Sequence, residues 1–384
     1  MSKPSILHIC LSQGWGGLEM YPTRTGKAFL ERGYAVYGLC LSGTHVAKEM
    51  RNIGIEAFEV SSKRSLMLTQ ILHLSKWLKE RNVSIIHCHK SGDILVSALL
   101  DIFTKRKTLF TEHMGVTRPK RDIYHRLVYW HIDHVLSISN ETYKRNLNAL
   151  PISQEKISRL WLGTDIPLSP IENPITIRQI KNELGLPCDS IVIGNIGRVC
   201  HGKGQMELLE SFALLKERHS KLHLLLVGGL DMSSGSDESF VSRLKSRVKE
   251  LSLESCVHLT GFRKDTDRML SAMDVVCLPN HNEAFGLTAI EAMAAQKAIV
   301  AWRSGALPEI LGSTALICPP FNEEEMSLSI ESYLNNKSLL RDNAIRAYER
   351  AQQEFSMTSH ILKLEKFYCY YCLLYTSPSP RDRH

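Results

Sequence analysis

Short apolar runs alternate with amphipathic segments along most of this 384-residue chain. The apolar runs have the length of buried strands, and the segments between them have the spacing of helices that cover a sheet. Strands joined by helices run parallel, so the sequence predicts doubly wound α/β domains. Because one hydrophobic core rarely serves a chain of this length, we expect two domains.

The alternation occurs in two series. In the first, the predicted strands are 5–11, 35–41, 57–60, 85–87, 108–111 and 134–137, and the predicted helices are 18–32, 44–53 and 65–81. In the second, the predicted strands are 190–194, 222–227, 257–259, 275–278 and 298–301, and the predicted helices are 204–218, 237–251, 265–273 and 287–296. Prolines and polar residues interrupt the pattern between the two series.

These boundaries predict an N-terminal Rossmann-like domain over 1–166, a linker over 167–187, a C-terminal Rossmann-like domain over 188–354 and a closing helix over 355–371. Residues 372–384, CLLYTSPSPRDRH, do not continue the helical pattern, and we interpret them as translated sequencing adapter. In folds of this kind ligands bind at the carboxyl ends of the strands. The two domains are therefore expected to face each other across a ligand-binding cleft.

Several features predict a cytoplasmic protein. The chain begins MSKPSILHIC, which lacks the parts of a signal peptide. The sequence has no run of apolar residues long enough to span a membrane. Its ten cysteines lie mostly in apolar contexts, which is typical of reduced thiols.

Positive charge is concentrated in the N-terminal half. Residues 1–166 carry 23 Lys and Arg against 14 Asp and Glu, a net of +9, whereas residues 167–384 carry 24 against 26, a net of −2. The excess forms two clusters, Lys105-Arg106-Lys107 and the group Arg118, Lys120, Arg121 and Arg126. Such clusters attract anionic lipid, nucleic acid or an anionic acceptor, although they also occur on ordinary solvated surfaces.

The most informative segment has the sequence NEAFGLTAIEAMA and begins at Asn282, after a predicted strand. Gly286 ends the loop, and the helix that follows presents first-turn amides and the positive end of its dipole, which favour an anion. Glu283 and Glu291 are eight positions apart and can reach both sides of that anion. Carboxylates accept hydrogen bonds from hydroxyls. A sugar joined to a ribose through phosphates has hydroxyls at both ends and negative charge in the middle, which matches two carboxylates on either side of an anion site.

A second loop with complementary chemistry follows the first strand of the second series. Its sequence is NIGRVCHGKG, and it carries Arg198 and Lys203 at a strand end. A guanidinium fork and a lysine point charge suit a diphosphate, whose charge grows as it departs. The Walker pattern is absent from the sequence, so this is a different kind of phosphate loop.

Together these motifs resemble the retaining family 4 glycosyltransferases of the GT-B fold, and the resemblance extends over residues 6–371. The segment from Glu283 to Glu291 matches the family's E-x7-E motif. The resemblance implies that Glu283 contacts hydroxyls of the donor sugar and that Glu291 binds the nucleotide ribose. Arg198 and Lys203 match the family's G-R and K-G elements, which stabilise the leaving nucleotide.

The resemblance also implies roles elsewhere in the chain. Gly16 and Gly17 match a loop that contacts the donor phosphate and shapes the acceptor site, and His113 matches a histidine beside the reacting sugar. The implied catalytic residues are His113, Arg198, Lys203 and Glu283, and the implied donor-binding residues are Gly16, Gly17, Arg198, Lys203, Phe262, Glu283, Ala284, Phe285, Gly286, Leu287 and Glu291. The N-terminal domain would bind the acceptor and the C-terminal domain the nucleotide sugar.

We predict no metal site and no cofactor other than the donor substrate. No D-x-D motif stands at a predicted strand end, and the loop cations with the helix amides would replace a metal. His87 and His89 alternate on one strand and are expected to face opposite ways, so that they cannot bind one metal ion together. A retaining reaction without a placed nucleophile favours front-face attack, in which the departing phosphate takes the acceptor proton.

The predicted enzyme is a hexosyltransferase that uses a nucleoside diphosphate sugar and a glycan or lipid-linked acceptor, in cell-surface polysaccharide or lipopolysaccharide synthesis. It would work as a peripheral protein on the anionic cytoplasmic face of the inner membrane, and it would bind no nucleic acid. A nucleotide-hexosamine 2-epimerase of the same fold and a catalytically inactive partner subunit are the alternatives. A tandem-Rossmann NAD-dependent dehydrogenase is disfavoured, because the turn at Gly16 and Gly17 lacks the G-x-G-x-x-G spacing.

Overall fold

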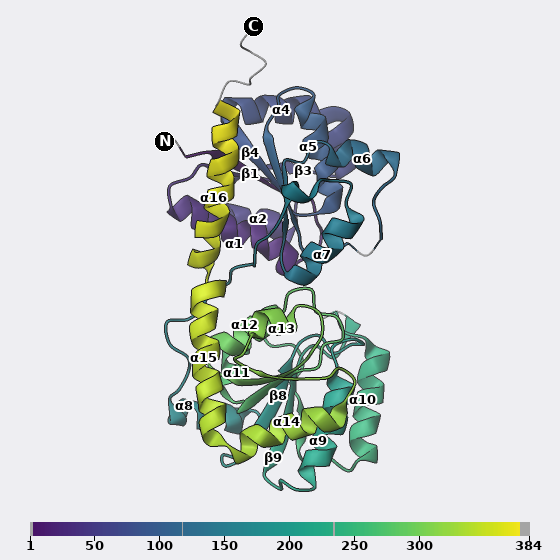
Figure 1. Ribbon diagram of the computed structural model, residues 1–384, viewed down its shortest axis with the longest axis vertical. Helices are drawn as coiled ribbons and strands as arrows, with labels where there is room; N and C mark the ends of the chain where they lie inside the picture. The colour runs from purple at the N-terminus through teal and green to yellow at the C-terminus, as the bar shows by residue number, and fades with distance from the viewer. Residues whose placement is uncertain (1–2, 117, 233–234, 377–384) are drawn as a thin grey trace. The chain divides into compact units, whose positions relative to one another are not determined.

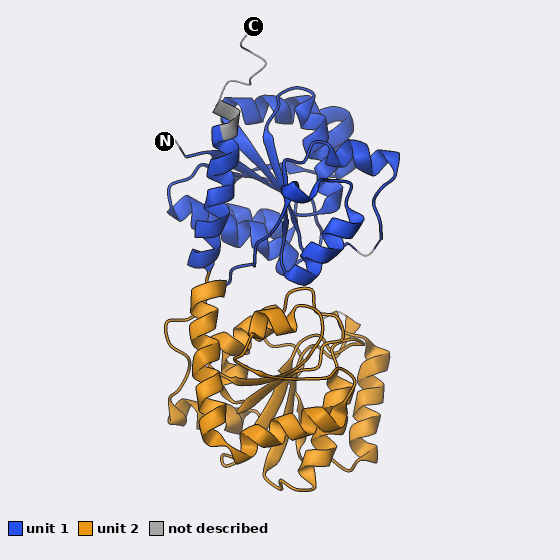
Figure 2. Cartoon of the chain, viewed as in Figure 1, with its two compact units in different colours: residues 1–164, 357–384 blue, residues 165–356 orange. Residues whose placement is uncertain are grey.

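The computed structural model describes residues 3–116, 118–232 and 235–376, in two compact units. Unit 1 is Met1–Thr164 with Met357–His384, and unit 2 is Asp165–Ser356 (Figure 2). Each unit is a parallel sheet with flanking helices (Figure 1). The predicted fold class of two tandem Rossmann-like domains is therefore confirmed.

Unit 1 contains a seven-stranded sheet in the order β3-β2-β1-β4-β5-β6-β7. The strands are β1 Ser5–Cys10, β2 Val36–Leu41, β3 Glu56–Val60, β4 Val83–Cys88, β5 Lys107–Glu112, β6 His134–Ser137 and β7 Ile157–Arg159. The helices are α1 Gly17–Glu31, α2 His45–Asn52, α3 Lys63–Ser65, α4 Ile71–Glu80, α5 Ile94–Asp101, α6 Ile123–Tyr129, α7 Asn140–Ala149 and α16 Met357–Thr376, with the short turns η1 Leu66–Gln70, η2 Ser91–Asp93 and η3 Gln154–Lys156.

The central strand β1 shows why the strands of unit 1 are apolar at successive positions and not only at every second one. Leu7 and Ile9 belong to the core on one face of the sheet, and Ile6 and Cys10 to the core on the other. All four side chains are fully buried. A parallel strand covered on both faces must be apolar at successive positions.

Helix α16 belongs to unit 1, although it follows unit 2 in the sequence. Ile361, Leu364 and Tyr368 are buried in the second core of unit 1. The Met357 amide donates to the Thr164 carbonyl at 2.8 Å, where the chain leaves and re-enters the unit. The helix extends past the predicted end at residue 371, into the segment interpreted as adapter, and most of that segment lies outside the described residues.

Unit 2 contains a six-stranded sheet in the order β10-β9-β8-β11-β12-β13. The strands are β8 Ile191–Ile196, β9 Leu222–Val227, β10 Val257–Leu259, β11 Val275–Leu278, β12 Ala298–Trp302 and β13 Leu316–Cys318. The helices are α8 Pro174–Glu183, α9 Gln205–Lys216, α10 Glu238–Glu250, α11 Thr266–Ser271, α12 Leu287–Ala294, α13 Leu307–Leu311, α14 Glu323–Asn335 and α15 Lys337–Phe355.

The segment predicted as a linker differs from the structure. It contains α8, which belongs to unit 2. Asn173 accepts a hydrogen bond from the Ile175 amide, and Pro174 occupies the first helical position. Proline is favoured at that position because its amide hydrogen is not needed there. Pro174 therefore begins a helix, and the linker predicted over 167–187 is wrong for that part.

In both sheets the order of the strands reverses beside one central strand. In unit 1, β1 lies between β2 and β4, and in unit 2, β8 lies between β9 and β11. The connections after the two strands at such a point leave on opposite faces of the sheet, which opens a crevice at their carboxyl ends. The loops that carry Lys203 and Glu283 follow β8 and β11, at this point of unit 2. Among the described residues, no helix combines the length and the apolar character needed to cross a membrane.

Candidate active site

Two loops meet at the point in unit 2 where the strand order reverses, one after β8 and one after β11. The His281 amide of the second loop donates to the Gly202 carbonyl of the first at 2.9 Å. Gly204 has a φ of 75°, and a Cβ atom there would lie 2.1 Å from the Pro279 carbonyl oxygen. A larger residue at position 204 would therefore push the loops apart. The loops form one structural element built on both strands.

This junction brings Lys203 and Glu283 together. Lys203 Nζ donates to Glu283 Oε2 at 2.9 Å, and Asn280 Nδ2 donates to the same oxygen at 2.6 Å. The lysine side chain is 29% exposed and the glutamate 16%. Both groups are thus mostly removed from water and still reachable by a ligand. An arriving phosphate or hydroxyl would compete for a cation and a carboxylate that hold each other.

The loop after β12 fixes the main chain of Glu283. The Ala306 amide donates to the Glu283 carbonyl at 2.8 Å, and the Ser304 hydroxyl donates to the His281 carbonyl at 2.6 Å. Gly305 has a φ of 54°, and a Cβ there would lie 2.1 Å from the Glu283 carbonyl oxygen. Sequence analysis missed this support. Its signal was a Ser-Gly pair shortly after a buried strand.

Helix α12 presents its N-terminus at the same place. Gly286 precedes the helix with a φ of 99°, and Leu287 is the first helical residue. The Ala289 amide donates to the Gly286 carbonyl at 3.0 Å, so the first-turn amides without an intrahelical acceptor are those of Leu287 and Thr288. Glu291 is half-buried on the same helix. The Phe285 side chain is 3% exposed and packs 6.3 Å from the Phe355 ring, centroid to centroid. Only its main chain is therefore placed to contact a ligand.

Three other predicted residues lie on loops of unit 2. Arg198 follows β8 with an exposed side chain, and its carbonyl accepts from Gln205 Nε2 at 3.0 Å. Ala284 is half-buried next to Glu283. Phe262 is 64% exposed after β10, a strand separated from β8 by β9. The structure therefore joins Lys203 to Glu283 and places Phe262 on a more distant loop.

The glycine loop of unit 1 already holds a negative group. Gly16 is the N-cap of α1, and Gly17 is its first residue. The Ser12 hydroxyl donates to Glu19 Oε1 at 2.6 Å, and a Cβ on Gly16 would lie 3.5 Å from Glu19 Oε2. A carboxylate is favoured at a helix N-terminus for the same reason as a phosphate. A donor phosphate would have to displace Glu19 from this loop.

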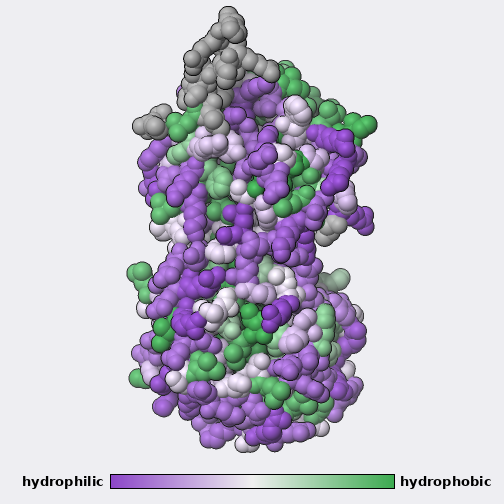
Figure 3. Space-filling view, in the orientation of Figure 1, coloured by the Kyte–Doolittle hydropathy of each residue, from purple (hydrophilic) through white to green (hydrophobic). Residues whose placement is uncertain are grey.

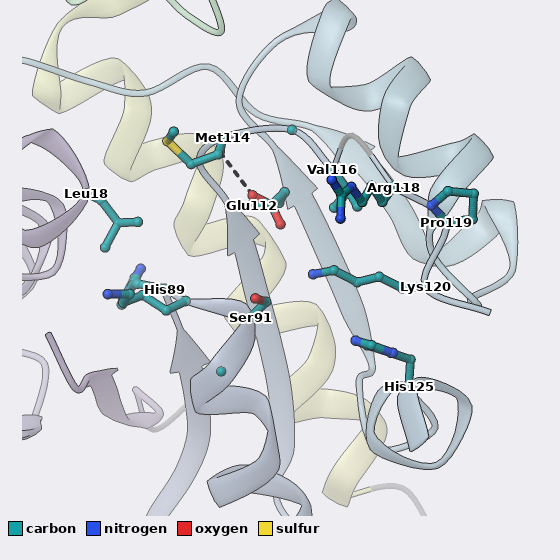
Figure 4. A pocket seen from close by; sticks show the side chains of 13 residues that line it. Leu18, His89, Ser91, Glu112, Met114, Val116, Arg118, Pro119, Lys120 and His125 are labelled. Carbon is teal, nitrogen blue, oxygen red and sulfur yellow. Dashed lines mark hydrogen bonds between the residues drawn. The ribbon is translucent and has the colours of Figure 1, made fainter. Parts of the chain in front are cut away.

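A pocket of about 570 Å³ opens at the carboxyl ends of β4 and β5 (Figure 4). Glu112, in its wall, is 7% exposed and accepts from the Met114 amide at 3.0 Å, and burial raises the pKa of its carboxyl. Lys120 points into the same pocket, and burial lowers its pKa. Arg118 and His125 add to the lining. Sequence analysis missed Glu112, although a charged residue at the end of a buried strand was a usable signal.

His113, the predicted catalytic histidine, is not among the residues that line this pocket. It is 6% exposed, and its ring centroid lies 5.0 Å from that of Tyr21. Burial lowers its pKa to about 3, so the ring is neutral at pH 7. Within the described residues its Nε2 atom has no hydrogen-bond partner. The structure places this histidine in the core of unit 1, beside Glu112 in sequence.

The prediction that His87 and His89 face opposite ways is wrong. Their ring centroids are 4.4 Å apart, because alternate residues of a strand lie on the same face. His8 Nδ1 lies 2.9 Å from His89 Nε2, and the three histidines offer ligand atoms within 4.8 Å of one another. However, His87 already bonds through both ring nitrogens, to Tyr368 at 2.6 Å and to Thr111 at 2.7 Å.

In the first basic cluster, Lys105-Arg106-Lys107, two of the three side chains bond to other groups of unit 1. Arg106 is 5% exposed, and its Nε donates to the Val83 carbonyl at 3.1 Å. Lys107 Nζ forms an ion pair with Asp133 at 2.8 Å. Only Lys105 of the three is exposed. The interpretation of this cluster as a surface for an anionic partner is therefore wrong for Arg106 and weak for Lys107.

Two family models together match most of the chain. The one described as Glycosyltransferase Family 4 matches residues 15–167, and the one described as Glycosyl transferases group 1 matches residues 176–351. The chain belongs to glycosyltransferase family 4. This confirms the family resemblance read from the motifs, and the two matches correspond to the two sheets of the GT-B fold.

Known proteins resemble this glycosyltransferase in sequence and in fold. The D-inositol 3-phosphate glycosyltransferase of Corynebacterium jeikeium is 38% identical over 132 residues, which are 33% of this chain and 31% of that protein. The chain spans about a third to a half of the curated relatives that it matches. A glycosyltransferase from Rickettsia africae has a TM-score of 0.86 at 22% identity, covering 98% of this chain and 100% of that one. Anabaena HepE, solved with UDP, has a TM-score of 0.82 at 20% identity, covering 95% and 100%. At these identities the structural likeness shows the fold.

Proposed function

We propose that this glycosyltransferase moves a sugar from a nucleoside diphosphate sugar to a hydroxyl group of a glycan or lipid-linked acceptor. The observation that carries the proposal is the 2.9 Å contact between Lys203 and Glu283, beside the N-terminus of α12. A lysine and first-turn amides suit a diphosphate, and a carboxylate suits sugar hydroxyls. The UDP bound by a protein of the same fold supports a nucleoside diphosphate.

Donor binding would separate the ion pair. A diphosphate that binds Lys203 replaces Glu283 as its partner, which frees the carboxylate for a sugar hydroxyl. The bond between the anomeric carbon and the phosphate oxygen then breaks, and its electron pair stays on that oxygen. Lys203, Arg198 and the helix amides stabilise this charge without a metal. The acceptor oxygen bonds to the anomeric carbon on the same face, with retention, and its proton passes to the departing phosphate.

The unit 1 pocket is our candidate for the acceptor site. Glu112 would accept hydrogen bonds from acceptor hydroxyls, and Lys120 would attract an anionic group such as the phosphate of a lipid carrier. The composition of the pocket supports this choice, because its carboxylate and its cations lie within one cavity (Figure 4). Such an acceptor fits a peripheral enzyme at the cytoplasmic face of the inner membrane.

The two glutamates should affect nucleotide binding differently. Glu291→Ala is expected to weaken the binding of UDP or GDP about tenfold or more, because a charged hydrogen bond to the ribose is lost. Glu283→Ala should leave this affinity unchanged or raise it, since Lys203 no longer has to leave a partner, while turnover falls. Titration calorimetry with each diphosphate measures the affinities, and Glu250→Ala, an exposed acidic residue of the same unit, is the control. Equal losses in both variants would contradict the division of roles.

A further inference from the structure

One side of α6 carries large apolar residues toward solvent. Ile123, Leu127 and Trp130 are 78%, 66% and 83% exposed, and their spacing of four and three positions places them on one side of the helix. Val128 and Tyr129, on the other side, are buried in the core of unit 1. The side of the helix with Val128 and Tyr129 packs in the core, and the exposed apolar side makes no contribution to that core.

The apolar surface continues onto the end of α5. His131 Nδ1 lies 3.0 Å from Asp101 Oδ2, which fixes the end of α5 next to the residue that follows Trp130. We define the α6 surface as Ile102, Phe103, Ile123, Tyr124, Leu127 and Trp130, which are 46% to 83% exposed. Figure 3 shows hydrophobic and hydrophilic residues side by side at the rim of unit 1 where Figure 1 places α6. An apolar group of this kind with a polar border is typical of an interaction site.

Positive charge accompanies the α6 surface. The exposed cations in these segments are Lys105, Arg118, Arg121 and Arg126. Of the neighbouring acids, Asp133 forms an ion pair with Lys107 at 2.8 Å, whereas Asp122 and Asp101 bond only to histidines, at 2.5 Å and 3.0 Å. The four exposed cations outnumber these two carboxylates, so the net charge beside the apolar residues is positive, which selects an anionic partner.

We propose that the α6 surface docks on an anionic lipid membrane, with its apolar side chains in the interfacial region and its cations at the lipid phosphates. Trp and Tyr with aliphatic residues on one side of a helix, and Lys and Arg around them, make up the composition of interfacial helices. His125 of α6 also lines the unit 1 pocket, so docking would bring the pocket to the headgroups. This last step rests on the proposed function, in which that pocket takes a lipid-linked acceptor.

Vesicle sedimentation of the full chain tests the proposal. The protein should bind vesicles of phosphatidylcholine mixed with phosphatidylglycerol, bind pure phosphatidylcholine far less, and release at high salt. The double variant Leu127→Gln, Trp130→Gln should lower the partition coefficient at least tenfold. Replacing Lys105 and Arg126 with Gln should lower it about fivefold for each charge. Ile175→Gln with Leu328→Gln, exposed apolar residues of unit 2, is the matched control and should change nothing.

Calorimetry with UDP or GDP on the same variants separates this proposal from the proposed function. Normal nucleotide binding together with lost vesicle binding supports the α6 surface as the docking site. If the wild-type protein binds vesicles but no nucleotide, the proposed donor site is contradicted and the docking proposal is not. Unchanged partition in the Leu127→Gln, Trp130→Gln variant, or equal binding to neutral and anionic vesicles, would overturn the proposal. So would a wild-type dimer that this variant makes monomeric, since the surface would then join two copies of the chain.

Discussion

Acidification from pH 7 to pH 5 is expected to unfold unit 1. The unit holds six histidines that are at most 6% exposed: His8, His87, His89, His113, His134 and His360. Burial lowers the pKa of His8 and His113 to about 3 and that of His134 and His360 to about 4, and it holds the pKa of His87 and His89 well below the usual value. All six are therefore neutral in the folded unit, and all six take up a proton when the unit unfolds in mild acid.

The sign of the effect follows from linkage. A histidine whose folded pKa is depressed contributes stability that is fully present above its unfolded pKa near 6.5 and is lost as the pH falls below that value. Each proton taken up on unfolding costs about 1.4 kcal/mol per pH unit, so six cost about 8 kcal/mol per pH unit. Between pH 6.5 and pH 5 this amounts to about 12 kcal/mol, which is comparable with the whole stability of about 5 to 15 kcal/mol that a domain has. Asp93, whose pKa burial raises to about 6, and Glu112, whose pKa burial also raises, act in the opposite direction, but as two groups against six.

Tryptophan fluorescence during an acid titration measures this transition. Trp15, Trp77, Trp130 and Trp161 lie in unit 1, and only Trp302 lies in unit 2, so the emission reports mainly on unit 1. Proton uptake, followed with a pH indicator, should approach six per molecule. His113→Asn should reduce the steepness by about one proton, and His73→Asn, an exposed histidine of the same unit, should not. A midpoint below pH 4, or uptake of fewer than two protons, would contradict the prediction.

The fold could be predicted where burial alone determines the sequence. The predicted bounds of β9, β10 and β11 agree with the structure. β11 is apolar at every position because both of its faces are covered, and β9 and β10 are apolar except for His223 and His258. The three-residue strands β7 and β13 were missed, since such short runs have no periodicity. Helix α6 was also missed. Its exposed apolar side removes the contrast between polar and apolar faces on which helix recognition depends.

The donor site could be predicted as a set of residue types but not as a set of contacts. Lys203 and Glu283 are 80 positions apart, and they meet because β8 and β11 are neighbours in the sheet. Strand order is a property of the whole fold, and no local pattern specifies it. The error about His87 and His89 has a different origin, because the two-residue period of a strand places them on one face. Correct use of that rule would have predicted the cluster with His8, its neighbour on β1.

Removal of Lys203 is expected to reduce turnover about 10²-fold or more, with a much smaller loss of donor affinity. The charge on the leaving phosphate is larger in the transition state than in the bound donor, so a cation placed there stabilises the transition state more. In the free enzyme Lys203 is also held by Glu283 at 2.9 Å, and breaking this contact offsets part of the gain from binding the donor. Arg198→Ala should have a comparable effect on turnover. Arg198→Lys should restore only part of it, because an ammonium cannot form the planar fork.

Turnover and donor affinity must be measured separately for each variant, with and without a chelator. Lys264→Ala, a loop cation after β10, is the control and should retain wild-type turnover. Full activity in Arg198→Ala and Lys203→Ala would return the loop after β8 to a structural role. Complete loss of wild-type activity in chelator would exclude the metal-free mechanism, whatever the variants do.

The double variant Lys203→Ala, Glu283→Ala distinguishes two ways in which Lys203 could matter. If Lys203 acts on the leaving phosphate and Glu283 on the sugar, the two side chains no longer contact each other in the donor complex, so the free energies that correspond to their losses of turnover from that complex should add. If Lys203 serves only to position Glu283 through their 2.9 Å contact, removing the glutamate already removes the function of the lysine. The double variant would then be no slower than Glu283→Ala alone. Because Asn280 Nδ2 also bonds the carboxylate at 2.6 Å, Glu283 keeps one anchor without the lysine, and we expect additive losses.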